Sequence, residues 1–483
     1  DIVVLMHDGG GDRSRTLPYL ASFIQQARAH GYSFVTLNQL YPQSSSLFAP
    51  TPVTLADKTA LYSASAYLVW PHALVTKLFV VTIISVGVSM LINTVLAAIS
   101  VRRIKYGRRR NGYEPLVSVV VPAYNEEAVL AKTVSSLLRS RYRRIEVLIV
   151  DDGSKDATWK VARKLAKRPK VRAFRKRNGG KARALNFGIK KARGDIVVGI
   201  DADTIFPPQT IGKLVRHFAD PAVGAVAGAV KVGNIQNALS RWQSLDYTVG
   251  IYIERNAQTL LGAVMIVPGA CGAWRKEAIK KARGYSSSTL AEDFDLTLAI
   301  HSLGYKVLQD NQALAYTEAP LTIHALFKQR FRWIFGDFQT FWKYRHLLFR
   351  RRSRWLGWYA LPLAIFSIIM PLVFGPLLLA VELENLLAGN YEVLLVFLAA
   401  TMGLQFLFAF IGLLIARERL RHLLVVPLTR VLYGPIRSFI LYRSVLRALK
   451  GAQVGWSKLQ RTNTVAYQPR SAEFSSVRAS AKP

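Results

Sequence analysis

The sequence predicts an integral membrane protein in which an α/β domain, built on a mainly parallel and doubly wound sheet, is inserted between transmembrane helices. Strands and helices alternate from about residue 116 to about residue 310, as they do where crossover helices join parallel strands. Long apolar segments flank that region at residues 78–101, 355–381 and 391–416. Each is long enough to cross roughly 30 Å of hydrocarbon.

The first residues are typical of the end of another α/β domain. Residues 1–41 contain an apolar strand, a glycine-rich turn, an amphipathic helix over residues 16–31 and a second strand, YSFVTL. Because residue 1 is an aspartate and a strand follows at once, we interpret the chain as a fragment or a processed product. Residues 42–77 are predicted to form a linker, since proline and serine are frequent at its start.

Lysine and arginine number 65 and acidic residues 29, which gives a net charge of +36. Such an excess indicates an anionic partner, which is a nucleic acid, an anionic lipid surface or a phosphorylated substrate. Basic residues gather at the ends of the apolar segments, so most of the excess is explained by membrane topology. The positive-inside rule places residues 102–354 in the cytoplasm and residues 1–77 outside a plasma membrane. Nucleic acid is therefore not an expected partner.

A weaker apolar segment covers residues 423–442 and contains Arg430, Arg437 and two prolines. These interruptions predict a transmembrane helix that is broken, or a re-entrant or interfacial segment. The side on which the chain ends depends on that choice and stays open. The basic tail over residues 443–483 is expected to be disordered from about residue 462.

Polar side chains follow three apolar strands of the α/β domain. The strand in VSVVVPAYNEE, residues 117–127, is followed by Tyr124, Asn125 and Glu126. The strand over residues 145–150 is followed by Asp151 and Asp152, and the strand over 195–200 by Asp201 and Asp203. Ligands of open α/β sheets bind at the carboxyl ends of strands. A helix-capping aspartate explains one such case but not three.

Asp201 and Asp203 are separated by one residue and point the same way on an extended segment. They can therefore share one Mg²⁺ or Mn²⁺, whose remaining ligands would be substrate phosphates and waters. The segment RNGGKARALNFG, residues 177–188, supports a diphosphate ligand. Its paired glycines open a helix whose N-terminus favours phosphate, and Lys181 adds positive charge.

A further acidic cluster, LAEDFDLTLAI, occupies residues 290–300. Acids at a solvated helix start need no functional explanation. A transferase, however, needs a base that takes the proton from the attacking hydroxyl. We predict Asp293 as this base, with Asp295 and Glu292 as alternates.

The ordered set of motifs VPAYNEE, DDGS, NGGKARALN, DAD, AEDFDLT and QRFRW resembles glycosyltransferase family 2. It is most similar to the processive membrane synthases of chitin oligosaccharides, hyaluronan, cellulose and poly-N-acetylglucosamine. The resemblance covers about residues 116–460. It implies a GT-A fold, a nucleoside-diphosphate sugar donor and inverting transfer. It also implies that Asp152 contacts the nucleoside, Asp203 the metal-bound diphosphate and Asp293 the acceptor hydroxyl.

The acceptor side of the predicted site combines two segments. The loop PGACGAWRKEA, residues 268–278, matches the family loosely, and its small residue Gly269 would let the sugar chain approach the backbone. Glu292 is also predicted to bind the acceptor. Residues 321–349 are predicted to form one or two amphipathic helices. The resemblance to these synthases implies that Gln329, Arg332 and Trp333 of this chain lie on an interfacial helix above the site. Arg332 offers a fork of donors to the diphosphate and Trp333 a flat face to the acceptor sugar. An apolar stripe of that helix is predicted to lie in the membrane interface: Phe327, Phe331, Phe335, Phe338 and Trp342.

The start of the chain, VVLMHDGGGDRSRT, resembles the closing motif of the polysaccharide deacetylase family, with His7 as the matching histidine. Such a pairing favours an N-acetylated polymer made from UDP-GlcNAc and extruded across the bilayer. The alternatives are a hyaluronan- or cellulose-type synthase using another UDP-sugar, and a single-transfer enzyme acting on a lipid. A membrane-anchored nucleic-acid-binding protein would leave the acidic clusters unexplained. The sequence leaves the oligomeric state open.

Overall fold

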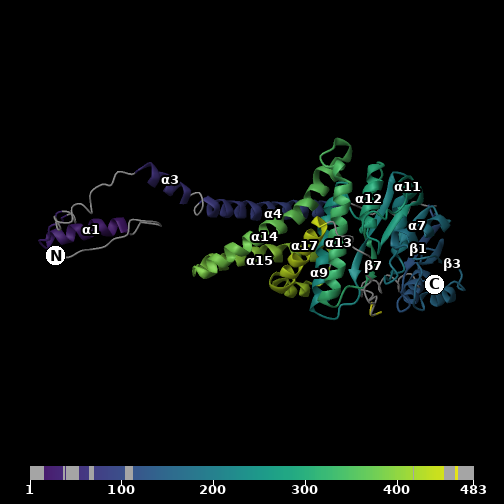
Figure 1. Ribbon diagram of the computed structural model, residues 1–483. Coiled ribbons are helices and arrows are strands. Elements are labelled where there is room, and N and C mark those ends of the chain that lie inside the picture. The colour runs from purple at the N-terminus through teal and green to yellow at the C-terminus, as the bar shows by residue number, and fades with distance from the viewer. Residues whose placement is uncertain are drawn as a thin grey trace. The chain divides into compact units, whose positions relative to one another are not determined.

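A computed structural model describes residues 16–35, 39, 54–64, 70–103, 113–416, 418–450 and 463–465 (Figure 1). The chain divides into two compact units, Asp1–Leu74 and Val75–Pro483. The predicted first strand, the glycine-rich turn and His7 lie outside the described residues.

The first unit contains α1 (Thr16–Ala29), α3 (Leu55–Ala64) and the start of α4 (Trp70–Arg103). The helix predicted over residues 16–31 is present. Residues 32–35, the described part of YSFVTL, form no strand, because no described residue of this unit pairs with them. Helix α3 lies within the predicted linker. Its start is capped reciprocally, since the Thr54 amide donates to Asp57 Oδ2 (2.9 Å) and the Asp57 amide to Thr54 Oγ1 (3.2 Å).

A seven-stranded sheet forms the centre of the second unit, with the strand order β3-β2-β1-β4-β6-β5-β7. The strands are β1 (Val117–Ala123), β2 (Ile145–Asp151), β3 (Val171–Arg175), β4 (Ile196–Gly199), β5 (Val223–Val232), β6 (Gly272–Arg275) and β7 (Lys306–Thr317). All pairs are parallel except those of β6, which runs antiparallel to both β4 and β5. The sheet is therefore mixed, although most of its pairs are parallel as predicted.

Helices cover both faces of this sheet. They are α5 (Leu130–Leu138), α6 (Thr158–Leu165), α7 (Lys181–Lys191), α8 (Thr210–Val215), α11 (Lys276–Lys281) and α12 (Glu292–Ser302). A second group lies towards the apolar helices: α9 (Ala238–Val249), the π-helix η4 (Gly250–Glu254), α10 (Arg255–Leu260) and α13 (Ile323–Lys343).

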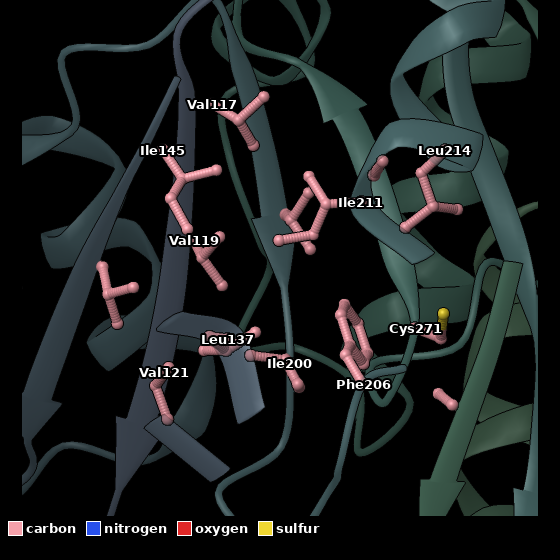
Figure 2. Packing of buried hydrophobic residues seen from close by; sticks show 14 of the residues in the cluster. Val117, Val119, Val121, Leu137, Ile145, Ile200, Phe206, Ile211, Leu214 and Cys271 are labelled. Atoms are coloured by element: carbon pink, nitrogen blue, oxygen red, sulfur yellow. The ribbon is translucent and has the colours of Figure 1, made fainter. Parts of the chain in front are cut away.

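Successive side chains of β1 enter different cores, because neighbouring residues of a strand point to opposite faces. Val117, Val119 and Val121 pack on the face shown in Figure 2, together with Ile145, Leu137, Ile200, Phe206, Ile211 and Leu214. Val120 packs on the other face, against Ala184, Leu185 and Ile189 of α7. The chain's single cysteine, Cys271, lies in the first core, with its Sγ 3.8 Å from the Ala313 carbonyl oxygen. Burial raises the pKa of its thiol.

Within the part of the chain that the structure describes, three helical segments are long and apolar enough to cross a membrane: Val80–Arg102, Leu356–Leu387 and Leu394–Ala416. They belong to α4, to the π-helix η7 (Leu356–Ala360) continued by α14 (Leu361–Leu387), and to α15 (Tyr391–Ala416). These are the three segments that the sequence predicts. Residues 420–449 are instead divided into η8 (Leu420–Val425), α16 (Val426–Leu428), the π-helix η9 (Thr429–Tyr433) and α17 (Gly434–Leu449).

Helix α17 packs along α13 (Figure 1), where the rings of Phe327 and Phe439 are 6.2 Å apart. Phe331 and Phe335 of α13 are buried in the same cluster, whose other buried members are Leu239, Trp242, Leu326, Tyr433 and Ile440. Within the stripe predicted for the membrane interface, Phe331 and Phe335 are therefore covered by protein, which corrects the prediction for these two residues, whereas Trp342 is 72% exposed. Periodicity identifies an apolar helix face but not what covers it.

The end of the described chain corrects a second prediction. Val465 is only 3% exposed and lies against Gly233, and Lys132 Nζ donates to the Asn463 carbonyl oxygen (3.4 Å). Residues 463–465 are therefore packed on the α/β domain, within the range expected to be disordered.

Candidate active site

The loops after β1 and β2 are joined by short hydrogen bonds. The Asn125 amide donates to Ser154 Oγ (2.9 Å), and Asn125 Oδ1 accepts from the Lys155 amide (2.8 Å). The Glu126 amide donates to Thr158 Oγ1 (2.7 Å). Asn125 has a φ of 52°, a left-handed conformation that asparagine tolerates better than most residues. Tyr124, Asn125 and Glu126 thus lie at the predicted rim, in a loop fixed by its own contacts.

Asp152 organises the glycine turn that precedes α7. Its carboxylate accepts hydrogen bonds from the Gly179 amide (3.1 Å), the Gly180 amide (2.7 Å) and Lys176 Nζ (2.5 Å). The side chain is almost fully buried. Asp152 therefore holds the turn at the carboxyl end of β2, where the sequence predicts the nucleoside and phosphates. Gly153 fits there because a side chain at that position would collide with the Asn178 amide.

Lys181 joins the donor side of the predicted site to the acceptor side. Its Nζ lies 2.8 Å from Asp201 Oδ1 and 2.8 Å from Glu292 Oε1. Burial acts to lower the pKa of Lys181, but Asp201, Glu292 and Asp293 outweigh it and raise that pKa. Gly269 passes so close that an added Cβ would lie 2.8 Å from this ammonium nitrogen. Residues that are far apart in the sequence thus meet around one cation.

Asp293 lies beside this cation. Its Oδ2 accepts from the Gly269 amide (3.0 Å) and its Oδ1 from the Phe294 amide (2.9 Å). Burial and then the Glu292 carboxylate raise its pKa, while Lys181 opposes them. A carboxylate with a raised pKa is a stronger proton acceptor, which suits a general base.

The alternates for the base have other roles. Asp295 is buried and accepts from Lys343 Nζ (2.7 Å), Tyr344 Oη (3.0 Å) and Thr289 Oγ1 (3.2 Å), so it pins the end of α13 to the start of α12. Glu292 is paired with Lys181. Asp293 therefore remains our candidate.

Asp203 is buried, and its Oδ1 accepts from Thr204 Oγ1 (3.3 Å). Burial raises the pKa of Tyr247 on α9, and the charge of Asp203 adds a smaller contribution in the same direction. Within the described ranges, no three His, Cys, Asp or Glu side chains are grouped as a metal site. Two carboxylates with a substrate diphosphate are nevertheless a donor set that fits Mg²⁺ or Mn²⁺. The pairing of Asp201 with Asp203 stays a prediction.

Helix α13 carries the three residues predicted above the site. Trp333 lies 6.3 Å from the Tyr247 ring at an interplanar angle of 32°. Arg332 is half-buried, and Gln329 Oε1 is buried without a hydrogen-bond donor in the described chain. The guanidinium of Arg330 lies 4.6 Å from the centroid of the Trp333 indole.

Two residues near the site were missed from the sequence. Arg330 pairs with Asp246 on α9 (2.9 Å). Asp337 follows Trp333 by one helical turn, and burial, then Asp293, raise its pKa to about 8. A signal for Asp337 was available, because it is the single acid in the aromatic stretch HALFKQRFRWIFGDFQTFW.

Comparisons with known proteins concern the family and the fold of this chain. Residues 118–283 match the family model described as glycosyl transferase family 2. The poly-beta-1,6-N-acetyl-D-glucosamine synthase of Staphylococcus aureus is 30% identical over 226 residues, which cover 46% of this chain and 55% of the relative. The synthase of the same name from Staphylococcus epidermidis matches at the same identity and coverage. The chain thus spans about half the length of the curated relatives it matches.

Among solved structures, a mannosyltransferase from Pyrobaculum calidifontis in complex with GDP-Man and Mn²⁺ has a TM-score of 0.53. It is 21% identical, and the match covers 73% of this chain and 98% of that one. At this identity the likeness shows the fold, a GT-A-like mixed α/β sheet.

Proposed function

From the premise that residues 118–283 are a glycosyl transferase family 2 domain, we propose that the chain polymerises a sugar with inversion and passes the polysaccharide across the membrane. The favoured donor is UDP-GlcNAc and the favoured product a β-linked N-acetylglucosamine polymer. The names of the staphylococcal relatives support this choice, as does the resemblance around His7 to a deacetylase.

One observation carries the proposal: Lys181 contacts Asp201 on the donor side and Glu292 on the acceptor side at 2.8 Å each. Asp293 lies next to them, bonded to the Gly269 amide. A cation suited to a diphosphate and a carboxylate suited to a hydroxyl proton are thus adjacent, as a direct displacement requires.

The proposed reaction uses these residues as follows. The acceptor hydroxyl gives its proton to Asp293, its oxygen forms a bond to the anomeric carbon, and the bond from that carbon to the diphosphate oxygen breaks. Lys181 stabilises the negative charge that develops on the leaving diphosphate. A divalent cation held by Asp201 and Asp203 would supply further charge neutralisation when bound. Asp152 and the glycine turn hold the nucleotide end of the donor.

The apolar helices complete the proposal. Helices α4, α14 and α15 would span the membrane, with the α/β domain in the cytoplasm and the loop at residues 382–390 outside. Residues 420–449 would remain on the cytoplasmic side, since α17 packs on α13 rather than forming an uninterrupted span.

The test uses the purified chain in lipid, given radiolabelled UDP-GlcNAc, UDP-glucose or UDP-glucuronic acid in separate reactions. We expect polymer from UDP-GlcNAc that a β-N-acetylglucosamine-specific glycosidase digests. An Asp293→Asn preparation serves as the inactive control. Addition of a single sugar to a lipid would overturn the polymerase proposal in favour of a single-transfer enzyme.

A further inference from the structure

Arg330 connects three elements around the proposed acceptor site. It extends from α13, and its Nη2 lies 2.9 Å from Asp246 Oδ2 on α9 and 3.5 Å from the Tyr433 hydroxyl oxygen of η9. The side chain is 15% exposed. Burial acts to lower its pKa, but Asp246 and two tyrosines outweigh that effect and raise it. The guanidinium therefore keeps its charge inside the protein.

The same guanidinium lies over two aromatic rings. Its central carbon is 4.6 Å from the centroid of Trp333 and 5.6 Å from that of Tyr247. Trp333 is three residues after Arg330, so both side chains leave the same face of α13. A partly desolvated guanidinium over an indole is an attractive contact that fixes the ring plane. The Tyr247 ring lies 6.3 Å from the same indole, so the ring of Trp333 has a protein contact from each of two helices.

We propose that Arg330, held by Asp246, is a positioning residue that sets the Trp333 ring for the acceptor chain. This inference rests on the proposed function. It gives the two arginines of QRFRW different tasks, since Arg332 was predicted to serve the diphosphate while Nη2 of Arg330 is engaged by Asp246 and Tyr433. It also links the acceptor platform to η9, so residues 420–449 contribute to the site.

The first experiment replaces the planar group but keeps the charge, with Arg330→Lys. Lysine cannot stack over the indole as a flat fork does. We expect kcat/KM for a chitin-oligosaccharide acceptor to fall about tenfold, through KM, because lysine keeps the charge but loses the planar contact that holds the ring. The donor dissociation constant and kcat at saturating acceptor should stay within about twofold of the wild-type values. Asp246→Asn should shift the acceptor KM in the same direction.

The control is Arg345→Lys. Arg345 covers the ring of Trp342 at 4.5 Å in the same geometry, but Trp342 is 72% exposed and lies at the far end of α13. Because the Trp342 ring is exposed to solvent and is not one of the predicted site residues, the variant should have wild-type acceptor kinetics. Loss of donor binding in Arg330→Lys would show a general structural role and would overturn the proposal.

A double-mutant cycle tests whether Arg330 acts through Trp333. In a Trp333→Ala background, Arg330→Lys should change kcat/KM for the acceptor by less than about twofold, because the ring that it positions is gone. An undiminished tenfold loss there would mean that Arg330 acts on a substrate directly, and an unchanged acceptor KM in the single variant would mean that it does not act at all. Either result would contradict the inference. Failure of the proposed function is distinguishable, since the wild-type protein would then not elongate the acceptor.

Discussion

At the scale of single residues, the proposed role of Asp293 as the base predicts a selective loss of transfer. Asp293→Asn keeps the shape of the side chain and can still accept from the Gly269 amide, but it cannot take a proton. Transfer should fall by at least about a hundredfold, while donor affinity, measured by titration calorimetry, stays within about threefold. Donor affinity lost in parallel with turnover would place Asp293 in the donor site instead.

Asp203 allows a prediction about metal. If Asp201 and Asp203 hold a divalent cation, chelator should abolish transfer, and Mg²⁺ or Mn²⁺ should restore it in the wild-type protein but not in Asp203→Ala. Tryptophan-fluorescence titration with Mn²⁺ gives a readout independent of turnover. Full activity of Asp203→Ala in the presence of chelator would contradict the assignment.

Asp337 predicts a pH dependence of stability. Its pKa in the folded protein is about 8, above the ordinary value of 3.8, because it is buried and then because Asp293 is near. The folded state therefore binds this proton more tightly than the unfolded state, and the stabilising effect is lost as pH rises from about 4 to about 8. Asp337→Asn, which cannot ionise, should gain thermal stability over the wild-type protein with rising pH. If the difference in melting temperature between Asp337→Asn and the wild-type protein stays constant across this pH range, the raised pKa of Asp337 is contradicted.

At the scale of single residues, the sequence predicted which side chains follow the strands better than it predicted which residues those side chains contact. Asp152, Asp201 and Asp203 follow apolar strands, so a local pattern reveals them. The contact of Lys181 with Glu292, or of Asp295 with Lys343, joins segments brought together only by the folded chain. Nothing local in the sequence shows which of Asp293 and Asp295 is the better candidate for the base. The structure separates the two residues, because Asp295 is paired with Lys343.

At the scale of elements, α13 is fixed to the start of α12 through a glycine. A Cβ at Gly336 would lie 2.7 Å from the Ala291 amide nitrogen and 2.9 Å from the Ala291 Cβ. Gln339 Oε1 accepts from the neighbouring Leu290 amide (2.9 Å). Gly336→Ala should therefore push α13 away from Glu292 and Asp293, at a cost of about 1–3 kcal/mol, and should reduce transfer strongly.

The matched control is Gly403→Ala in α15, where an added Cβ meets nothing within 4 Å. Thermal unfolding of both variants in detergent, followed by light scattering, makes the comparison. Equal melting temperatures for the two variants would show that α12 and α13 move apart at little cost in stability, despite the close approach of Gly336 to Ala291.

Elements whose periodicity is local were predicted well, and those defined by long-range packing were not. The strands β1, β2 and β4 and the helix α15 were found from apolar runs alone. The antiparallel direction of β6 could not be, because a short buried strand looks the same in either direction. The π-helices η7 and η9 likewise have no apolar period that separates them from the helices they continue.

For the whole molecule, the topology is testable with single cysteines, since the native Cys271 is fully buried and should not react. Asn390→Cys, in the exposed loop between α14 and α15, should react with a membrane-impermeant maleimide on intact cells. Lys280→Cys, exposed at the end of α11, should react only after permeabilisation. The opposite pattern would invert the predicted orientation.

The burial of Cys271 also has a kinetic consequence. Its sulfur lies against Gly228 of β5 so closely that an added Cβ there would collide with it, and a reagent can reach the thiol only after these central strands separate. With excess alkylating reagent, the rate of labelling in the native chain therefore reports how often the core around Cys271 opens. A nucleotide sugar that binds only the closed domain slows the labelling in proportion to its occupancy. The lone thiol thereby measures donor binding in a lipid membrane without any sugar being transferred.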